Sequence, residues 1–146
     1  RRIICKRNPQ IRYKERKCVY AILYDNNGNI AITNDGKYFF FGGGREAKEK
    51  ELETLEREML EETGYTIKDI ELFDRLTSYE YNSSRGNLKI VATIYLAKLD
   101  KKVVEPIEKD HPILWGKPEE YINKMYHEYQ RVILKEYIEK YNKEKR

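Results

Sequence analysis

The chain has few residues that could form disulfide bonds or zinc sites: two cysteines and two histidines in 146 residues. Cys5 and Cys18 show neither a CxxC pair nor the Cys/His spacing of a zinc site. Disulfides belong mainly to oxidising compartments, so an isolated pair of cysteines favours two free thiols. We therefore expect a reduced, cytoplasmic protein.

Long apolar runs are also missing, as is the pattern of a secretory leader, so we expect no membrane-spanning helix. Hydrophobic residues still make up 40% of the chain, and aromatic residues include 13 tyrosines. That content can form a core, and the length suits one domain over residues 1–146.

Neither sign of charge dominates, because the chain has 29 Lys and Arg and 25 Asp and Glu, which gives a net charge of +4. The basic residues nevertheless gather at the ends: Arg1, Arg2, Lys6, Arg7, Arg12, Lys14, Arg16 and Lys17 at the start, and Lys140, Lys143, Lys145 and Arg146 at the finish. Solvated ends are the simpler interpretation. Attraction of a polyanion such as RNA is the alternative.

The most informative segment is a dense, ordered set of carboxylates that follows a glycine run. Glu58, Glu61 and Glu62 are three and four residues apart, so on a helix they share one face. Like charges on one face repel unless a cation lies among them. Clustered carboxylates favour Mg²⁺ or Mn²⁺, and such ions commonly hold phosphate groups. This pattern predicts metal-assisted chemistry on a phosphorylated substrate.

The same carboxylates belong to a longer motif of fixed spacing, G-x5-E-x7-R-E-U-x-E-E-x-G-U, in which U is a bulky apolar residue. It is occupied by Gly43, Glu49, Arg57, Glu58, Met59, Glu61, Glu62, Gly64 and Tyr65. This is the Nudix box, and the chain resembles a small, MutT-like Nudix hydrolase. The resemblance implies an α/β fold, an α/β/α sandwich with a mixed sheet, in which the box forms a loop–helix–loop.

The resemblance also implies roles for the box residues. Glu58, Glu61 and Glu62 would bind Mg²⁺ or Mn²⁺, and the Gly43 region would add a carbonyl ligand. Arg57 and Glu49 would orient the loop and the glutamates. The implied reaction is attack of water on the diphosphate of a nucleoside diphosphate linked to another group, with a nucleoside triphosphate or a modified one as the default substrate. An RNA 5′-end pyrophosphohydrolase or decapping-type enzyme and a non-catalytic nucleotide-binding module remain alternatives, and a homodimer stays open.

No motif identifies the general base or the residues that hold the substrate. Carboxylates available outside the box are Glu80, Glu108, Asp110 and Glu119, for each of which a surface role is the simpler interpretation. The two histidines, His111 and His127, stand alone in the sequence, which favours structural roles. Aromatic side chains available to stack on a base are Tyr20, Tyr24, Phe39, Phe41, Tyr79, Tyr81 and Trp115. Among these we favour Tyr79 and Tyr81, which lie on one strand face beside a polar loop.

Hydrophobic patterns and turn residues predict the elements around the box. Strands are expected at residues 18–24, 30–33, 38–41, 76–81 and 88–99, and helices at 47–63 and 118–141. Residues 101–117 are expected to be irregular, and 143–146 to fray. Leu52, Leu55 and Met59 recur at helical spacing, so we expect all three to face the core.

Overall fold

The computed structural model of the protein describes residues 1–144. Its strands are β1 (Arg2–Ile3), β2 (Lys14–Tyr24), β3 (Ile30–Asn34), β4 (Tyr38–Phe39), β5 (Phe41–Gly44), β6 (Tyr65–Asn82), β7 (Gly86–Lys102) and β8 (Leu114–Gly116). The helices are α1 (Glu51–Thr63), α2 (Pro118–Tyr121) and α3 (Glu128–Glu144), with a 3₁₀ turn at Ile122–Lys124. Among the described residues, no helix is long and apolar enough to cross a membrane.

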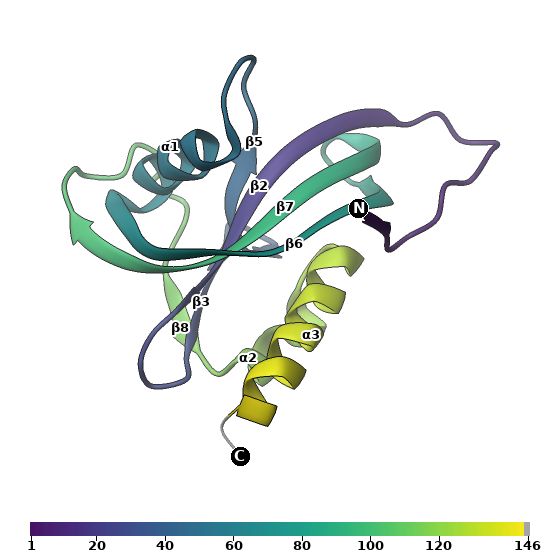
Figure 1. Cartoon of the computed structure of the whole chain (residues 1–146). Coiled ribbons are helices and arrows are strands. Elements are labelled where there is room, and N and C mark those ends of the chain that lie inside the picture. The colour runs from purple at the N-terminus through teal and green to yellow at the C-terminus, as the bar shows by residue number, and fades with distance from the viewer. Residues whose placement is uncertain (145–146) are drawn as a thin grey trace.

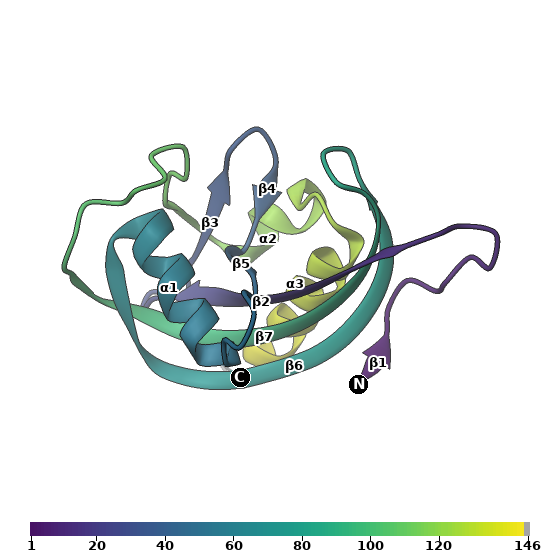
Figure 2. The same ribbon diagram turned by 90° about the horizontal axis from the view of Figure 1, so that it is seen from above.

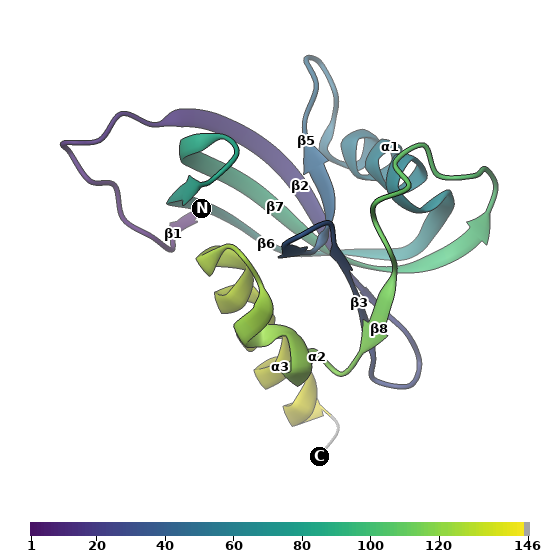
Figure 3. The same ribbon diagram turned by 180° about the vertical axis from the view of Figure 1, so that it is seen from behind.

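The strands form one mixed sheet with helices on both faces. The order is β1-β6-β7-β2-β3-β4, with β5 paired to β2 and β8 to β3. The centre is parallel, because β2 runs alongside β7 in the same direction, and β6 and β7 form a long antiparallel hairpin. Helix α1 covers one face and α3 the other (Figures 1 and 3). The predicted α/β/α sandwich is confirmed.

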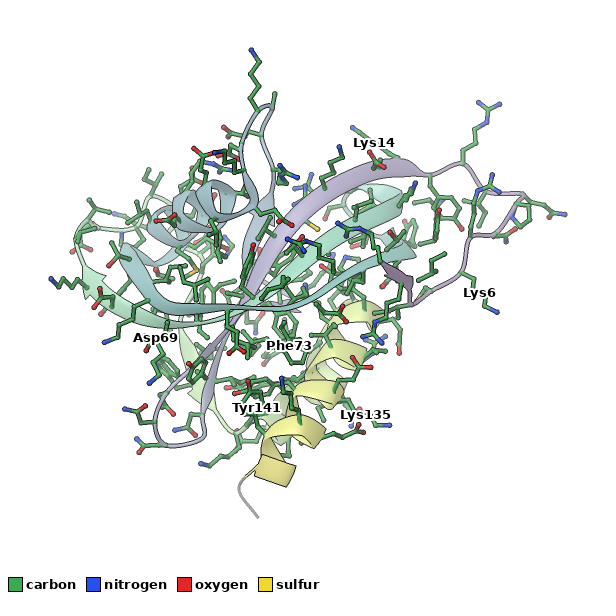
Figure 4. All side chains as sticks on the ribbon, in the orientation of Figure 1. Lys6, Lys14, Asp69, Phe73, Lys135 and Tyr141 are labelled. Atoms are coloured by element: carbon green, nitrogen blue, oxygen red, sulfur yellow. The ribbon has the colours of Figure 1, made fainter. Side chains whose placement is uncertain are left out.

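Alternation along the central strand β2 separates two hydrophobic cores. Val19, Ala21 and Leu23 are fully buried on the side of α1. Cys18 and Ile22 are buried on the side of α3. Phe73 of β6 lies on the α3 side of the sheet (Figure 4). Helices α1 and α3 are therefore each held against the sheet by a separate hydrophobic cluster.

Helix α1 begins at Glu51, four residues later than predicted. The preceding residues form a tight loop instead, because Glu49 Oε1 accepts the Glu46 N–H at 2.8 Å and the Glu49 N–H bonds to the Glu46 carbonyl. Lys48 takes a positive φ of 68° within this loop. At the other end Gly64, with φ 78°, closes the helix as predicted.

The expectation that Leu52 faces the core is wrong. Leu55 and Met59 are fully buried, but Leu52 is 40% exposed. Leu52 lies in the first turn beside Glu51, whose carboxylate bonds to Arg75 at 2.7 Å on the surface of the sheet. Helical spacing gives the direction of a side chain, but it does not show whether the fold covers that turn.

Two other predicted elements are divided in the structure. Residues 38–41 form two short strands, because β4 pairs with β3 and β5 pairs with β2. The helix expected at 118–141 is interrupted at Met125, which is extended and bridges to Tyr38. The segment expected to be irregular contains β8, which pairs with β3. Residues 143 and 144 continue α3, and the rest of the segment expected to fray lies outside the described residues.

Candidate active site

A cleft of about 670 Å³ lies between α1, the glycine strand β5, the tip of the β6–β7 hairpin and the start of α3. Figure 2 shows these elements from above. It is lined by Glu58, Glu62, Glu108 and His111, and also by Thr33, Phe39, Asn82 and His127. Basic side chains lining it are Arg16, Lys37, Arg45, Arg57 and Arg85. The cleft therefore contains an acidic group on and beside α1 and a polar, partly aromatic group from β3, β4, the β6–β7 hairpin and the residue before α3, with basic side chains along its walls.

The glycines of β5 let the sheet and α1 approach each other closely. A Cβ at Gly42, which has φ 142°, would lie 2.1 Å from the Val19 carbonyl oxygen. A Cβ at Gly43 would lie 2.6 Å from the Glu58 carboxylate. Neither position has room for a side chain. The backbone is thus held against the carboxylates, and the Gly42 N–H donates to Glu62 Oε1 at 2.9 Å.

Arg57 joins the box loop to the box helix. Its Nε and Nη2 donate to the two oxygens of Glu49 at 2.7 and 3.0 Å, and Nη2 also reaches the Gly44 carbonyl at 3.0 Å. Its Nη1 lies 2.8 Å from Glu58 Oε1 and 3.2 Å from Glu61 Oε2. These bonds lower the pKa of Glu49 to about 2, and Arg57 is the main cause. The bidentate pair fixes the loop, and the same guanidinium offsets part of the repulsion on α1.

Glu62 is the most buried carboxylate of the cleft, with 4% of the residue exposed. Burial raises its pKa well above the usual value, and the nearby charge of Glu58 adds to the effect. Burial also raises the pKa of Glu58, although Arg57 opposes this. Ionisation of Glu58 and Glu62 is therefore unfavourable in the folded protein, and a bound cation would stabilise their charged forms.

The donors around Glu62 fit a divalent metal ion. Ligand atoms of Glu62, Glu108 and His111 lie within 4.8 Å of one another. His111 Nδ1 is buried 3.2 Å from Glu62 Oε2, yet it has no hydrogen-bond partner among the described residues. The Glu108 N–H donates to the Glu61 carbonyl at 2.9 Å, which fixes this loop to α1. Carboxylate-rich sites of this kind suit Mg²⁺ or Mn²⁺.

The other residues considered from the sequence have different positions. Asp110 and Glu119 do not line the cleft, whereas Glu108 and His111 do. Tyr81 is 63% exposed, and the Tyr79 ring packs edge-on against Tyr13, with centroids 5.0 Å apart. Neither tyrosine lines the cleft, so the prediction that they hold a base gains no support from this geometry.

Of the aromatic side chains considered, Tyr20 and Phe39 do line the cleft. Sequence reasoning did not single out Thr33, Asn82 or Arg85 as cleft residues, and it considered Arg16 only as part of the basic start of the chain. These residues come from β2, β3 and the β6–β7 hairpin and match no motif, so no sequence signal could have brought them together.

Glu80 has a structural role in connecting the sheet to α3. Its carboxylate accepts the Glu128 and Tyr129 N–H groups at 2.8 and 2.9 Å, the Ser78 hydroxyl at 2.8 Å and His127 Nδ1 at 3.1 Å. Burial alone would raise the pKa of Glu80, but the hydrogen bonds from His127 and Ser78 outweigh it, and the pKa is lowered. An ionised carboxylate therefore caps the N-terminus of α3.

Replacing Glu80 by Gln should lower the free energy of unfolding at pH 7 by about 2 kcal/mol, because charge-assisted hydrogen bonds are lost. A lowered pKa contributes stability above the unfolded value near 4.5, and that stability is lost as pH falls through the folded value. The difference in free energy of unfolding between wild type and E80Q, measured in urea, should therefore become smaller at acid pH. Glu128→Gln, at an exposed pair with Arg131, should change stability little at either pH. If this difference were the same at pH 7 and pH 3, the ionised Glu80 carboxylate would not be what stabilises the fold.

Comparisons with known proteins agree with this geometry. The family model of the NUDIX domain matches residues 14–137. A NUDIX hydrolase from Nitrosomonas europaea has a TM-score of 0.70 and 16% identity, covering 85% of this chain and 88% of its own. A MutT protein from Methanosarcina mazei has a TM-score of 0.66 and 19% identity, covering 90% and 98%.

A mutator MutT protein from Bacillus halodurans has a TM-score of 0.60 and 23% identity, covering 82% of this chain and 80% of its own. At such identities the solved structures show a shared fold. No curated protein matches the chain. The family model covers most of the chain, including the whole box and its cleft. The chain therefore belongs to the NUDIX family of hydrolases, which act on pyrophosphate bonds.

Proposed function

We propose that the protein is a Mg²⁺- or Mn²⁺-dependent pyrophosphohydrolase whose substrate is a nucleoside triphosphate or a modified one, and that it acts in the cytoplasm. One observation carries the proposal: Glu58 and Glu62 lie close to the Gly42–Gly43 backbone, and all four residues line a cleft of about 670 Å³. A cleft of this volume suits a nucleotide-sized ligand. Cys5 and Cys18 are both free thiols, consistent with a reduced compartment.

In this proposal Glu58, Glu61 and Glu62 hold the metal, with the Gly43 carbonyl as a further ligand. When bound, the ion neutralises diphosphate charge and lowers the pKa of a water molecule. Arg57 and Glu49 keep the glutamates in place through the bonds described above. The basic side chains of Arg16, Arg45 and Arg85 line the same cleft and would supply charge to hold phosphates.

The test is product release from a panel of nucleoside triphosphates and diphosphate-linked nucleotides, with and without Mg²⁺. We expect hydrolysis of one class of these compounds, with phosphate, pyrophosphate or a nucleoside monophosphate as products, and no reaction in EDTA. Hydrolysis that continues at the same rate in EDTA would contradict the metal role. Tight nucleotide binding without any turnover would instead support the non-catalytic alternative.

An RNA 5′ end is the second candidate substrate, because the segment before β2 is basic and extended. Lys6 projects outward from this segment, and Lys14 lies at the start of β2 (Figure 4). Binding of an RNA would release counterions from its phosphates, so the affinity should fall steeply as the salt concentration rises. Weak salt dependence, with efficient turnover of free nucleotides, would count against RNA.

A further inference from the structure

The cleft also contains buried polar groups that the proposed reaction does not use. Thr33 is 1% exposed, His127 6% and Asn82 8%, and all three line the cleft. They are contiguous through Phe39. Thr33 pairs with Phe39 across β3 and β4, the Phe39 and His127 ring centroids are 6.1 Å apart, and His127 Nε2 lies 3.2 Å from Asn82 Nδ2. We call these four residues the base patch.

The hydrogen bonds determine the orientation of the Asn82 amide. Its Oδ1 accepts the N–H groups of Ser84 and Arg85 at 2.9 and 3.1 Å, and because an N–H can only donate, this atom must be the oxygen. Asn82 Nδ2 therefore faces His127 and donates to Nε2. In this arrangement His127 Nε2 accepts from Asn82 and His127 Nδ1 donates to Glu80.

Two polar groups of the base patch remain for a ligand. The second N–H of Asn82 has no acceptor among the described residues, and the buried Thr33 hydroxyl has no hydrogen-bond partner there. Buried polar groups rarely stay unpaired, because each such group costs free energy in the folded protein. The half-buried Phe39 ring beside them offers a flat apolar face. The two free polar groups, the Asn82 amide and the Thr33 hydroxyl, are uncharged and lie beside an aromatic ring, so a ring with polar edges fits there better than a phosphate.

We propose that the base patch binds the nucleobase of the substrate and that Asn82 donates to a carbonyl oxygen on the base. The subsite would prefer a 6-oxopurine or 4-oxopyrimidine to the corresponding amino base, because an amino group would place two donors against each other. This inference rests on the proposed function, since it assumes a nucleotide in the cleft. It adds the class of base and the residues that select it.

The binding test uses inosine and adenosine 5′-monophosphate, which differ in the 6-oxo and 6-amino groups and contain no anhydride to hydrolyse. We expect inosine monophosphate to bind about tenfold more tightly, as one hydrogen bond and one avoided clash would give. Asn82→Asp keeps the Oδ1 acceptor of the turn and replaces the donor by an acceptor, so it should abolish or reverse the preference. Equal dissociation constants for the two nucleotides in the wild type would overturn the proposal.

Matched variants separate recognition from folding and from added charge. Asn26→Asp adds the same charge on the β2–β3 hairpin, outside the cleft lining, and should keep the wild-type ratio. Thr33→Val removes the unpaired hydroxyl with little change of shape. It should weaken inosine monophosphate binding several-fold, and it provides a second test should Asn82→Asp misfold. An unchanged ratio in folded Asn82→Asp, or unchanged binding in Thr33→Val, would refute the role of that residue.

The test also distinguishes failure of the subsite from failure of the proposed reaction. Nucleoside monophosphate binding needs no turnover, so selective binding without hydrolysis of any triphosphate would support the base patch and refute the pyrophosphohydrolase. Metal-dependent hydrolysis with equal kcat/KM for inosine and adenosine triphosphates, and likewise for uridine and cytidine triphosphates, would support the pyrophosphohydrolase. It would refute the base patch as the subsite that selects the base.

Discussion

Replacing Glu62 by Gln should lower metal-dependent turnover by at least about a hundredfold and leave the fold intact. A divalent ion contributes several kcal/mol of transition-state stabilisation, and about 3 kcal/mol corresponds to a hundredfold in rate. Gln has the same shape and can still accept the Gly42 N–H, so the loop contact can persist. What it loses is the anionic oxygen that faces His111 and the cleft. The measurement is kcat/KM over a range of Mg²⁺ concentrations.

Stability gives a second measure on the same variant. The pKa of Glu62 is raised, so the stability that it contributes is present below about pH 4.5 and is lost as pH rises. At pH 7, without metal, Gln should therefore be tolerated at least as well as Glu. Glu56→Gln is the matched control, since Glu56 is exposed on the same helix, and it should change neither rate nor stability. Near wild-type turnover in folded E62Q would refute the metal role of Glu62.

The largest effect on folding is expected from Leu55→Asp. Leu55 is fully buried against the sheet with Met59. The substitution removes a buried leucine, which alone costs about 2–5 kcal/mol, and places an unpaired carboxylate in an apolar core. The combined cost of about 5 kcal/mol or more is comparable to the whole stability of a small domain. We expect the variant to be largely unfolded by circular dichroism at 25 °C.

Leu52→Asp is the matched comparison, because it makes the same change one turn earlier in α1. Leu52 is 40% exposed, so a carboxylate there stays hydrated and the free energy of unfolding should fall by less than about 1 kcal/mol. Equal destabilisation by the two substitutions would show that the first turn of α1 is buried. It would then support the expectation, drawn from helical spacing, that Leu52 faces the core.

Local patterns accounted for much of the fold. The spacing of Glu58, Glu61 and Glu62 depends on the pitch of one helix, and Gly64 ends that helix within the same segment, so neither needs distant contacts. The strands at residues 18–24 and 30–33 follow from apolar runs on either side of an Asn-Gly turn. In the last helical segment the pattern misled because a distant partner intervened: Met125 leaves its helical run and bridges to Tyr38 of β4.

The sequence by itself determined the family, the box helix and the residues proposed to bind metal, because all of these are encoded by short-range spacing. Only the tertiary structure decided which other groups share the cleft. Glu108 and His111 reach Glu62 through a loop after β7, and Thr33 meets Asn82 through Phe39 and His127. These contacts depend on strand order and on the position of α3 against the sheet. Since such packing is set by the burial of the two cores rather than by spacing along the chain, no local motif could predict it.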